Sequence, residues 1–119
     1  MKRRILLGFI LFSLACTKEE SNPPAEEIDC MGITSTYSAD VKAIIDLSCA
    51  ISGCHVNGFI RGDFTTYEGL KTEIDNGSVQ LRTIEQRDMP PSNSSGPTSL
   101  TDAQIQLLHC WIEDGAPNN

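Results

Sequence analysis

Apolar residues recur at helical spacing in four stretches of the chain, and no stretch alternates apolar and polar residues as a half-buried strand does. The first stretch places Val41, Ile44 and Ile45 on one helical face. Ser38 is the expected cap of this helix, and Asp40 falls in its first turn, where a carboxylate interacts favourably with the helix dipole. The pattern therefore predicts an all-α fold.

Two further helices are predicted in the middle of the chain. Residues 65–68, with the sequence Thr-Thr-Tyr-Glu, resemble a capping box that opens the second helix, and Gly77 follows its end. The apolar stripe of this helix consists of Tyr67, Leu70 and Ile74. A short third helix is expected around Val79, Leu81 and Ile84.

The last predicted helix has the clearest boundaries. Thr101 is its expected cap, and Gln104 completes a capping box. Leu100 and Ile105 are spaced to form a hydrophobic staple, and Gly115 marks the end of the helix. Its buried face is expected to comprise Ile105, Leu108, Trp111 and Ile112.

The first 29 residues contain a predicted export signal and tether, and they are not expected to contribute to a folded core. Residues 1–15 resemble a bacterial lipoprotein signal, with three basic residues before an apolar run that is shorter than the roughly 20 residues needed to cross a bilayer. Cys16 follows directly, so we expect it to be acylated and to anchor the protein to a membrane of the bacterial cell envelope; cleavage as an ordinary secreted protein is the alternative. Residues 16–29 are polar and acidic and predict a flexible tether. Residues 30–119 remain for a single domain.

Charge limits the classes of partner. The chain has 9 Lys and Arg residues against 16 Asp and Glu, and removal of residues 1–15 would leave 6 against 16, a net charge near −10. This charge argues against nucleic acid as a partner and favours a basic redox partner. Aromatic residues are few for a domain of this size, and a large apolar cofactor would supply the missing bulk of the core.

The run Cys49-Ala-Ile-Ser-Gly-Cys54-His55 carries the most specific chemistry in the chain. Two nearby thiols followed directly by a histidine are what covalent haem attachment requires, because the thiols add to the haem vinyl groups and the imidazole binds the iron. The usual spacing puts two residues between the cysteines, and here there are four. Such Cys-x4-Cys-His runs resemble some sites of multihaem c-type cytochromes. The expected cofactor is one covalent haem c.

A second axial ligand to the iron is expected from outside this run. Met89 has a soft thioether, and Pro90 favours an extended backbone at Met89. His109 is the rival candidate, on the last helix. Ligation by histidine and methionine leaves no open iron site, so it favours an electron carrier over an enzyme. Three arginines are candidates to pair with a haem propionate, although a solvated surface position is the commoner state for each: Arg61, Arg82 and Arg87.

The remaining cysteines form an even pair in an oxidising compartment. With Cys16 assigned to lipid and two thiols assigned to haem, Cys30 and Cys110 are left, and we expect them to form a disulfide. Cys110 lies away from the apolar stripe of the last helix, so it is expected to face outward, where the segment that carries Cys30 can cross over it. Two free thiols are the alternative.

These features together resemble the small monohaem c-type cytochrome domains of exported bacterial lipoproteins. The resemblance covers most of residues 37–119: the helix before the Cys-His run, residues 63–70, Met89-Pro90-Pro91, and residues 100–117 with their ending Trp-Ile-Glu-Asp-Gly-Ala-Pro. It implies an all-α cytochrome c-like domain around one haem. It also implies that His55 and Met89 are the axial ligands and that the protein transfers electrons.

Three alternatives remain open from the residues alone. A haem-free structural or interaction lipoprotein would pair Cys49 with Cys54 in a disulfide. A haem enzyme or sensor, such as a peroxidase, would require Met89 to leave the iron. A zinc site at Cys49, Cys54 and His55 lacks a convincing fourth ligand.

Overall fold

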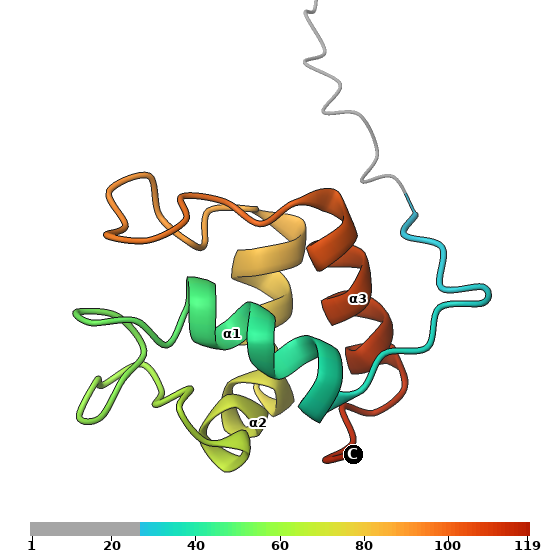
Figure 1. Ribbon diagram of the computed structural model, residues 1–119, viewed down its shortest axis with the longest axis horizontal. Helices are drawn as coiled ribbons and strands as arrows, with labels where there is room; N and C mark the ends of the chain where they lie inside the picture. The colour runs from blue at the N-terminus through green and yellow to red at the C-terminus, as the bar shows by residue number, and fades with distance from the viewer. Residues whose placement is uncertain (1–26) are drawn as a thin grey trace, which may run out of the picture.

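The computed structural model describes residues 27–119, which fold into helices joined by long loops (Figure 1). The elements are η1 (Tyr37–Val41), α1 (Lys42–Ser48), α2 (Tyr67–Asp75), η2 (Gln80–Glu85) and α3 (Asp102–Glu113), where η denotes a π-helix. No strand occurs among the described residues, so the predicted all-α class is confirmed for this part of the chain. The predicted signal, the acylated Cys16 and most of the tether lie outside the described residues. Within residues 27–119, every helix is too short or too polar to cross a membrane.

The first helix begins two residues earlier than predicted, because Thr36 and not Ser38 caps it. Thr36 has extended backbone angles, and its hydroxyl accepts a hydrogen bond from the Ala39 N–H at 3.2 Å. Asp40 reaches back and accepts from the Thr36 N–H at 2.9 Å, which completes a two-way cap. Ser38 instead donates its backbone N–H to the carbonyl of Asn119. η1 runs directly into α1, and Val41, Ile44 and Ile45 are buried as expected.

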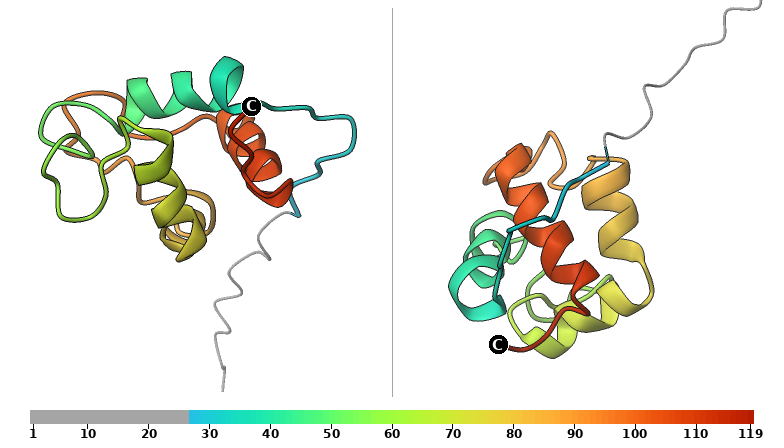
Figure 2. Two further views of the ribbon diagram at one scale, coloured as in Figure 1. Left: turned by 90° about the horizontal axis from the view of Figure 1, so that it is seen from below. Right: turned by 90° about the vertical axis from the view of Figure 1, so that its right-hand side faces the viewer.

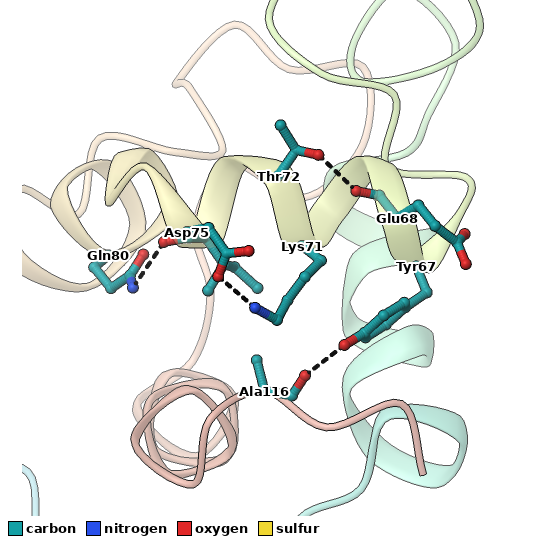
Figure 3. Close-up of polar contacts among 8 residues, drawn as sticks. Tyr67, Glu68, Lys71, Thr72, Asp75, Gln80 and Ala116 are labelled. Carbon is teal, nitrogen blue, oxygen red and sulfur yellow. Dashed lines mark hydrogen bonds and ion pairs between the residues drawn. The ribbon is translucent and has the colours of Figure 1, made fainter.

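α2 begins where predicted, but Thr66 is its cap rather than Thr65. The Thr66 hydroxyl accepts from the Gly69 N–H at 3.1 Å, whereas Thr65 bonds to the carboxylate of Asp63. Leu70 and Ile74 are buried. Figure 3 shows the polar face of this helix, with the Thr72 hydroxyl donating to the Glu68 carbonyl and Lys71 paired with Asp75.

The short third helix is present as η2, and the side chains around it are buried to different degrees. Val79 and Thr83 are buried, while Leu81 is 44% exposed. A π-helix forms i→i+5 hydrogen bonds and turns more slowly than an α-helix, so its buried positions do not follow α-helical spacing. Gln80 links the helix to α2 by donating its side-chain amide to the Ile74 carbonyl at 3.2 Å.

α3 matches its predicted boundaries and carries the disulfide. The Thr101 and Gln104 capping box is formed, and Ile105, Leu108 and Trp111 are buried. Cys30 and Cys110 are bonded across a sequence separation of 80 residues, which confirms the predicted disulfide.

As expected from its place off the apolar stripe of α3, Cys110 is crossed by the chain before η1, which carries Cys30. This segment runs along α3 (Figure 2) and leaves Cys110 only 2% exposed. The Ser35 hydroxyl donates to the Leu107 carbonyl at 2.9 Å, and the Gln106 amide donates to the Asp29 carbonyl at 2.7 Å. The segment is therefore fastened to α3 on both sides of the disulfide.

An aromatic cluster connects α3 to the start of the first helix and to α2. The ring of Tyr37 stacks on Trp111 with centroids 5.8 Å apart and meets Tyr67 edge-on at 5.1 Å. The Tyr67 hydroxyl donates to the Ala116 carbonyl at 2.8 Å (Figure 3), and the Trp111 indole donates to the Pro117 carbonyl. The core therefore lies on the α3 side, while the loops after α1 and after η2 extend from the other end of the domain (Figure 1).

Candidate functional site

A cavity of about 750 Å³ lies where these two loops approach each other. Its walls come from the end of α1, the loop that follows, one residue of α2, the chain that enters and forms η2, and the loop after η2. The four residues that the sequence singled out for haem binding all line it: Cys49, Cys54, His55 and Met89. The volume falls within the roughly 300–1,000 Å³ typical of pockets for ligands of drug size.

The Cys49–His55 loop closes on itself. The Cys49 N–H ends α1 by donating to the Ile45 carbonyl at 2.8 Å. Five residues later the Cys54 N–H donates to the Ile51 carbonyl, and the His55 N–H returns to the Cys49 carbonyl at 3.0 Å. Gly53 makes the turn possible with a φ of +84°, which disfavours other residues. The four-residue spacer thus brings both thiols and the imidazole to one wall.

Both thiols in this loop are free and partly buried, in contrast to Cys30 and Cys110. Burial away from water raises the pKa of the Cys49 thiol to about 12, with a smaller contribution from the neighbouring Cys54. Cys49 is therefore protonated at neutral pH when it carries no substituent.

The orientation of the His55 ring is fixed on several sides. Its Nδ1 lies 3.1 Å from the carbonyl oxygen of Arg61 and 3.2 Å from that of Gly62. Two carbonyls only accept hydrogen bonds, so they assign the ring proton to Nδ1 and leave Nε2 with a free lone pair. The ring stacks on Phe64 with centroids 4.0 Å apart and planes inclined by 5°, and it meets Phe59 edge-on. This is how a metal-binding histidine is usually held.

Met89 reaches the same cavity from a distant part of the sequence. The backbone N–H groups of Asp88 and Met89 both donate to the carbonyl of Arg82, at 3.0 and 3.3 Å, and so turn the chain back after η2. The Met89-Pro90 peptide bond is cis. Met89 is partly buried and Pro90 is buried. The fold therefore places a thioether on the same cavity as the imidazole of His55.

The cavity wall also exposes apolar side chains that sequence reasoning did not assign to a site. The described part of the chain has five exposed large hydrophobic residues, and three of them line the cavity: Phe59 (38% exposed), Ile60 (93%) and Leu81 (44%). The adjacent apolar pair Phe59-Ile60 in a glycine-rich loop was the available signal, because such residues in a loop have no helical face to bury. Leu81 was assigned only to the short third helix.

The three candidate arginines and the rival iron ligand His109 are divided between the cavity wall and other parts of the domain. Arg61 and Arg82 line the cavity, whereas Arg87 and His109 are not among the lining residues. Arg87 pairs with Asp102 at 2.8 Å, and His109 is a partly buried residue of α3. Across residues 27–119, no group of three or more His, Cys, Asp or Glu side chains converges as a metal-ion cluster would.

The donor set suits a haem better than a bare metal ion. A haem brings four of its own nitrogens to the iron, so the protein needs only axial ligands, and one imidazole and one thioether are present on the wall. Two free thiols lie on the same wall, where they could add to the vinyl groups of a haem. No model of a known protein family matches the chain, and neither the curated proteins nor the solved structures include a significant match to it.

Proposed function

We propose that this protein is an electron carrier of the bacterial cell envelope, with one haem c bound covalently in the cavity. Cys49 and Cys54 would hold the porphyrin through thioether bonds, and His55 and Met89 would bind the iron. The haem would supply one-electron redox chemistry. The observation that carries the proposal is the convergence of these four residues, from two distant segments, on one cavity.

The imidazole geometry supports the role of His55. A ligand to iron must present an unprotonated nitrogen, and the carbonyls of Arg61 and Gly62 select the tautomer in which Nε2 is that nitrogen. The stacking of Phe64 limits rotation of the ring. The chain therefore orients the imidazole before any ligand is bound, which reduces the cost of ligation.

The exposed apolar wall supports a large apolar ligand. Contiguous apolar surface is rare on soluble proteins unless something covers it. The side chains of Phe59, Ile60 and Leu81 are exposed, and each borders the cavity. A porphyrin would cover such surface, whereas a zinc ion would not.

The alternative with a disulfide between Cys49 and Cys54 has no comparable support. The two thiols are free in the same structure in which Cys30 and Cys110 are bonded. The membrane anchor on Cys16 and a basic redox partner remain parts of the proposal. The anchor rests on the sequence of residues 1–16, and the partner rests on the excess of acidic residues.

Expression of the full chain in a host that matures c-type cytochromes tests the proposal. We expect haem that stays attached after denaturation, and an absorption band of a thioether-ligated ferric haem. Met89→Ala should abolish this band and keep the haem attached. Met31→Ala is the matched control, because Met31 is 87% exposed and lies outside the cavity wall. A colourless product whose mass contains no haem would refute the proposal.

A further inference from the structure

The basic residues of the domain are nearly all neutralised by neighbouring carboxylates. Residues 27–119 contain five Lys and Arg side chains, and four of them form ion pairs: Lys42 with Asp46, Lys71 with Asp75, Arg82 with Asp88, and Arg87 with Asp102. Arg61 forms no ion pair with any described carboxylate. It is therefore the one guanidinium of the described chain whose charge is not balanced by a contact.

The position of Arg61 makes this charge significant. Its side chain is exposed and lines the cavity, so it stands at the solvent edge of the cavity. Its backbone carbonyl accepts the hydrogen bond from His55 Nδ1 at 3.1 Å, which fixes the residue next to the imidazole. Its neighbour Ile60 is 93% exposed on the same wall. A ligand that fits here meets apolar surface first and a cation at the edge.

The other charged residues on the wall are already engaged. Arg82 directs its Nε toward both carboxylate oxygens of Asp88, at 2.8 and 3.0 Å. Glu73, the one carboxylate among the described lining residues, accepts a hydrogen bond from the Asn76 amide at 3.0 Å. Arg61 is thus the lining residue that is best placed to receive an anionic group.

We propose that Arg61 forms an anion-binding site at the mouth of the cavity and that this site takes a propionate carboxylate of the haem. The inference rests on the proposed function. A guanidinium offers two parallel N–H groups that match the two oxygens of a carboxylate. Haem is apolar over most of its surface and carries two carboxylates at one edge. The cavity is complementary to it, because its wall exposes apolar side chains and Arg61 supplies a cation at its edge.

A comparison of two probes isolates the carboxylate contact. The full chain, made in a host without haem-attachment machinery and kept reduced, is titrated with haemin and with haemin dimethyl ester, in which both propionates are blocked. The measured quantity is the ratio of the two dissociation constants. Arg61→Gln should reduce the preference for haemin by about two- to fivefold, the range expected for a solvent-exposed charge pair. Arg61→Lys should retain part of the preference, and Arg87→Gln should leave it unchanged.

The outcomes separate this inference from the proposed function. A ratio of dissociation constants that is the same in Arg61→Gln and the wild type overturns the inference. This includes the case in which the variant loses the same affinity for both probes. A chain that binds neither probe and that receives no haem in a competent host overturns the proposed function, and this inference with it.

Discussion

The rings of His55 and Phe64 lie parallel, with their centroids 4.0 Å apart, and the Phe64 N–H donates to the His55 carbonyl at 2.9 Å. The two residues are therefore joined through both side chain and backbone. Between them the chain makes a loop. Gly62 in this loop supplies one of the two carbonyls that accept a hydrogen bond from His55 Nδ1. The direction of the imidazole thus depends on the conformation of a glycine seven residues later.

Gly62→Ala should disturb the imidazole and destabilise the domain. Gly62 has a φ of +99°, and an added Cβ would lie 2.7 Å from a ring carbon of Phe64 and 2.7 Å from Cγ of Glu73. We expect a loss of about 2–4 kcal/mol, from backbone strain plus overpacking. Urea unfolding measures the loss, and the NMR shifts of the His55 ring report its displacement.

Gly58→Ala is the control for this change. Gly58 has a φ of +82°, but an added Cβ would meet nothing within 4 Å. It should therefore show only the backbone cost, on the order of 1 kcal/mol, and unchanged His55 shifts. Equal effects of the two substitutions would show that the contact with Phe64 is not what positions the ring.

Loss of the disulfide should destabilise the domain strongly. Cys30 and Cys110 close a loop of 80 residues, for which the chain-entropy model gives about 4 kcal/mol. The double variant Cys30→Ala/Cys110→Ala should lose this amount in urea unfolding, and a reductant should bring the wild type to the same midpoint. Cys54→Ala, which removes a thiol outside the disulfide, should have a much smaller effect. An unfolding midpoint that is insensitive to reductant would contradict the prediction.

Removal of the α3 cap should cost about 1 kcal/mol. The Thr101 hydroxyl accepts from the Gln104 N–H at 3.2 Å, and the Gln104 side chain accepts from the Thr101 N–H at 2.9 Å. Thr101→Ala leaves one helix N–H unsatisfied in the first turn. Thr98→Ala, in the exposed loop before the helix, serves as the matched control in thermal or urea unfolding. Similar stabilities of the two variants would argue against the cap.

The sequence predicted the helices well where local chemistry determines them. The α3 capping box needs only residues three apart, so Thr101 and Gln104 could be identified from spacing. Ser38 was the wrong choice of cap because Thr36 has an additional partner in Asp40, and two residues that satisfy each other outcompete one. The crossing of the Cys30 segment over Cys110 was also predictable, because Cys110 lies off the apolar stripe of α3 and the even pair of cysteines indicated a disulfide.

The candidate site was predictable in its members but not in its surroundings. Cys49, Cys54 and His55 lie within seven consecutive residues, and Met89 precedes a proline pair, so their residue types and order were sufficient to select them. Phe59 and Ile60 were not recognised as wall residues, and Arg61 could not be preferred over Arg82 and Arg87, because their placement follows from the turn that brings two backbone carbonyls to His55 Nδ1. A contact of this kind leaves no pattern in the sequence.

The Cys49 thiol should make the haem-free protein less stable in alkali. Burial raises its pKa in the folded state to about 12, above the value of 9.0 that is ordinary for a cysteine. The folded protein therefore retains a proton that the unfolded chain releases above pH 9. The stabilisation is complete below pH 9 and is lost as the pH rises toward 12, by up to about 1.4 kcal/mol per pH unit.

Urea unfolding of haem-free wild type and Cys49→Ala between pH 8 and pH 11 measures this contribution. Other groups also titrate in this range, among them Tyr37, whose pKa burial raises, so the informative quantity is the difference between the two proteins. That difference should be constant below pH 9 and should then change steadily in favour of the variant, because alanine has no proton to release. Parallel stability curves over the whole range would mean that the Cys49 thiol is hydrated. They would also mean that the cavity wall around it is more open than the packing at the end of α1 implies.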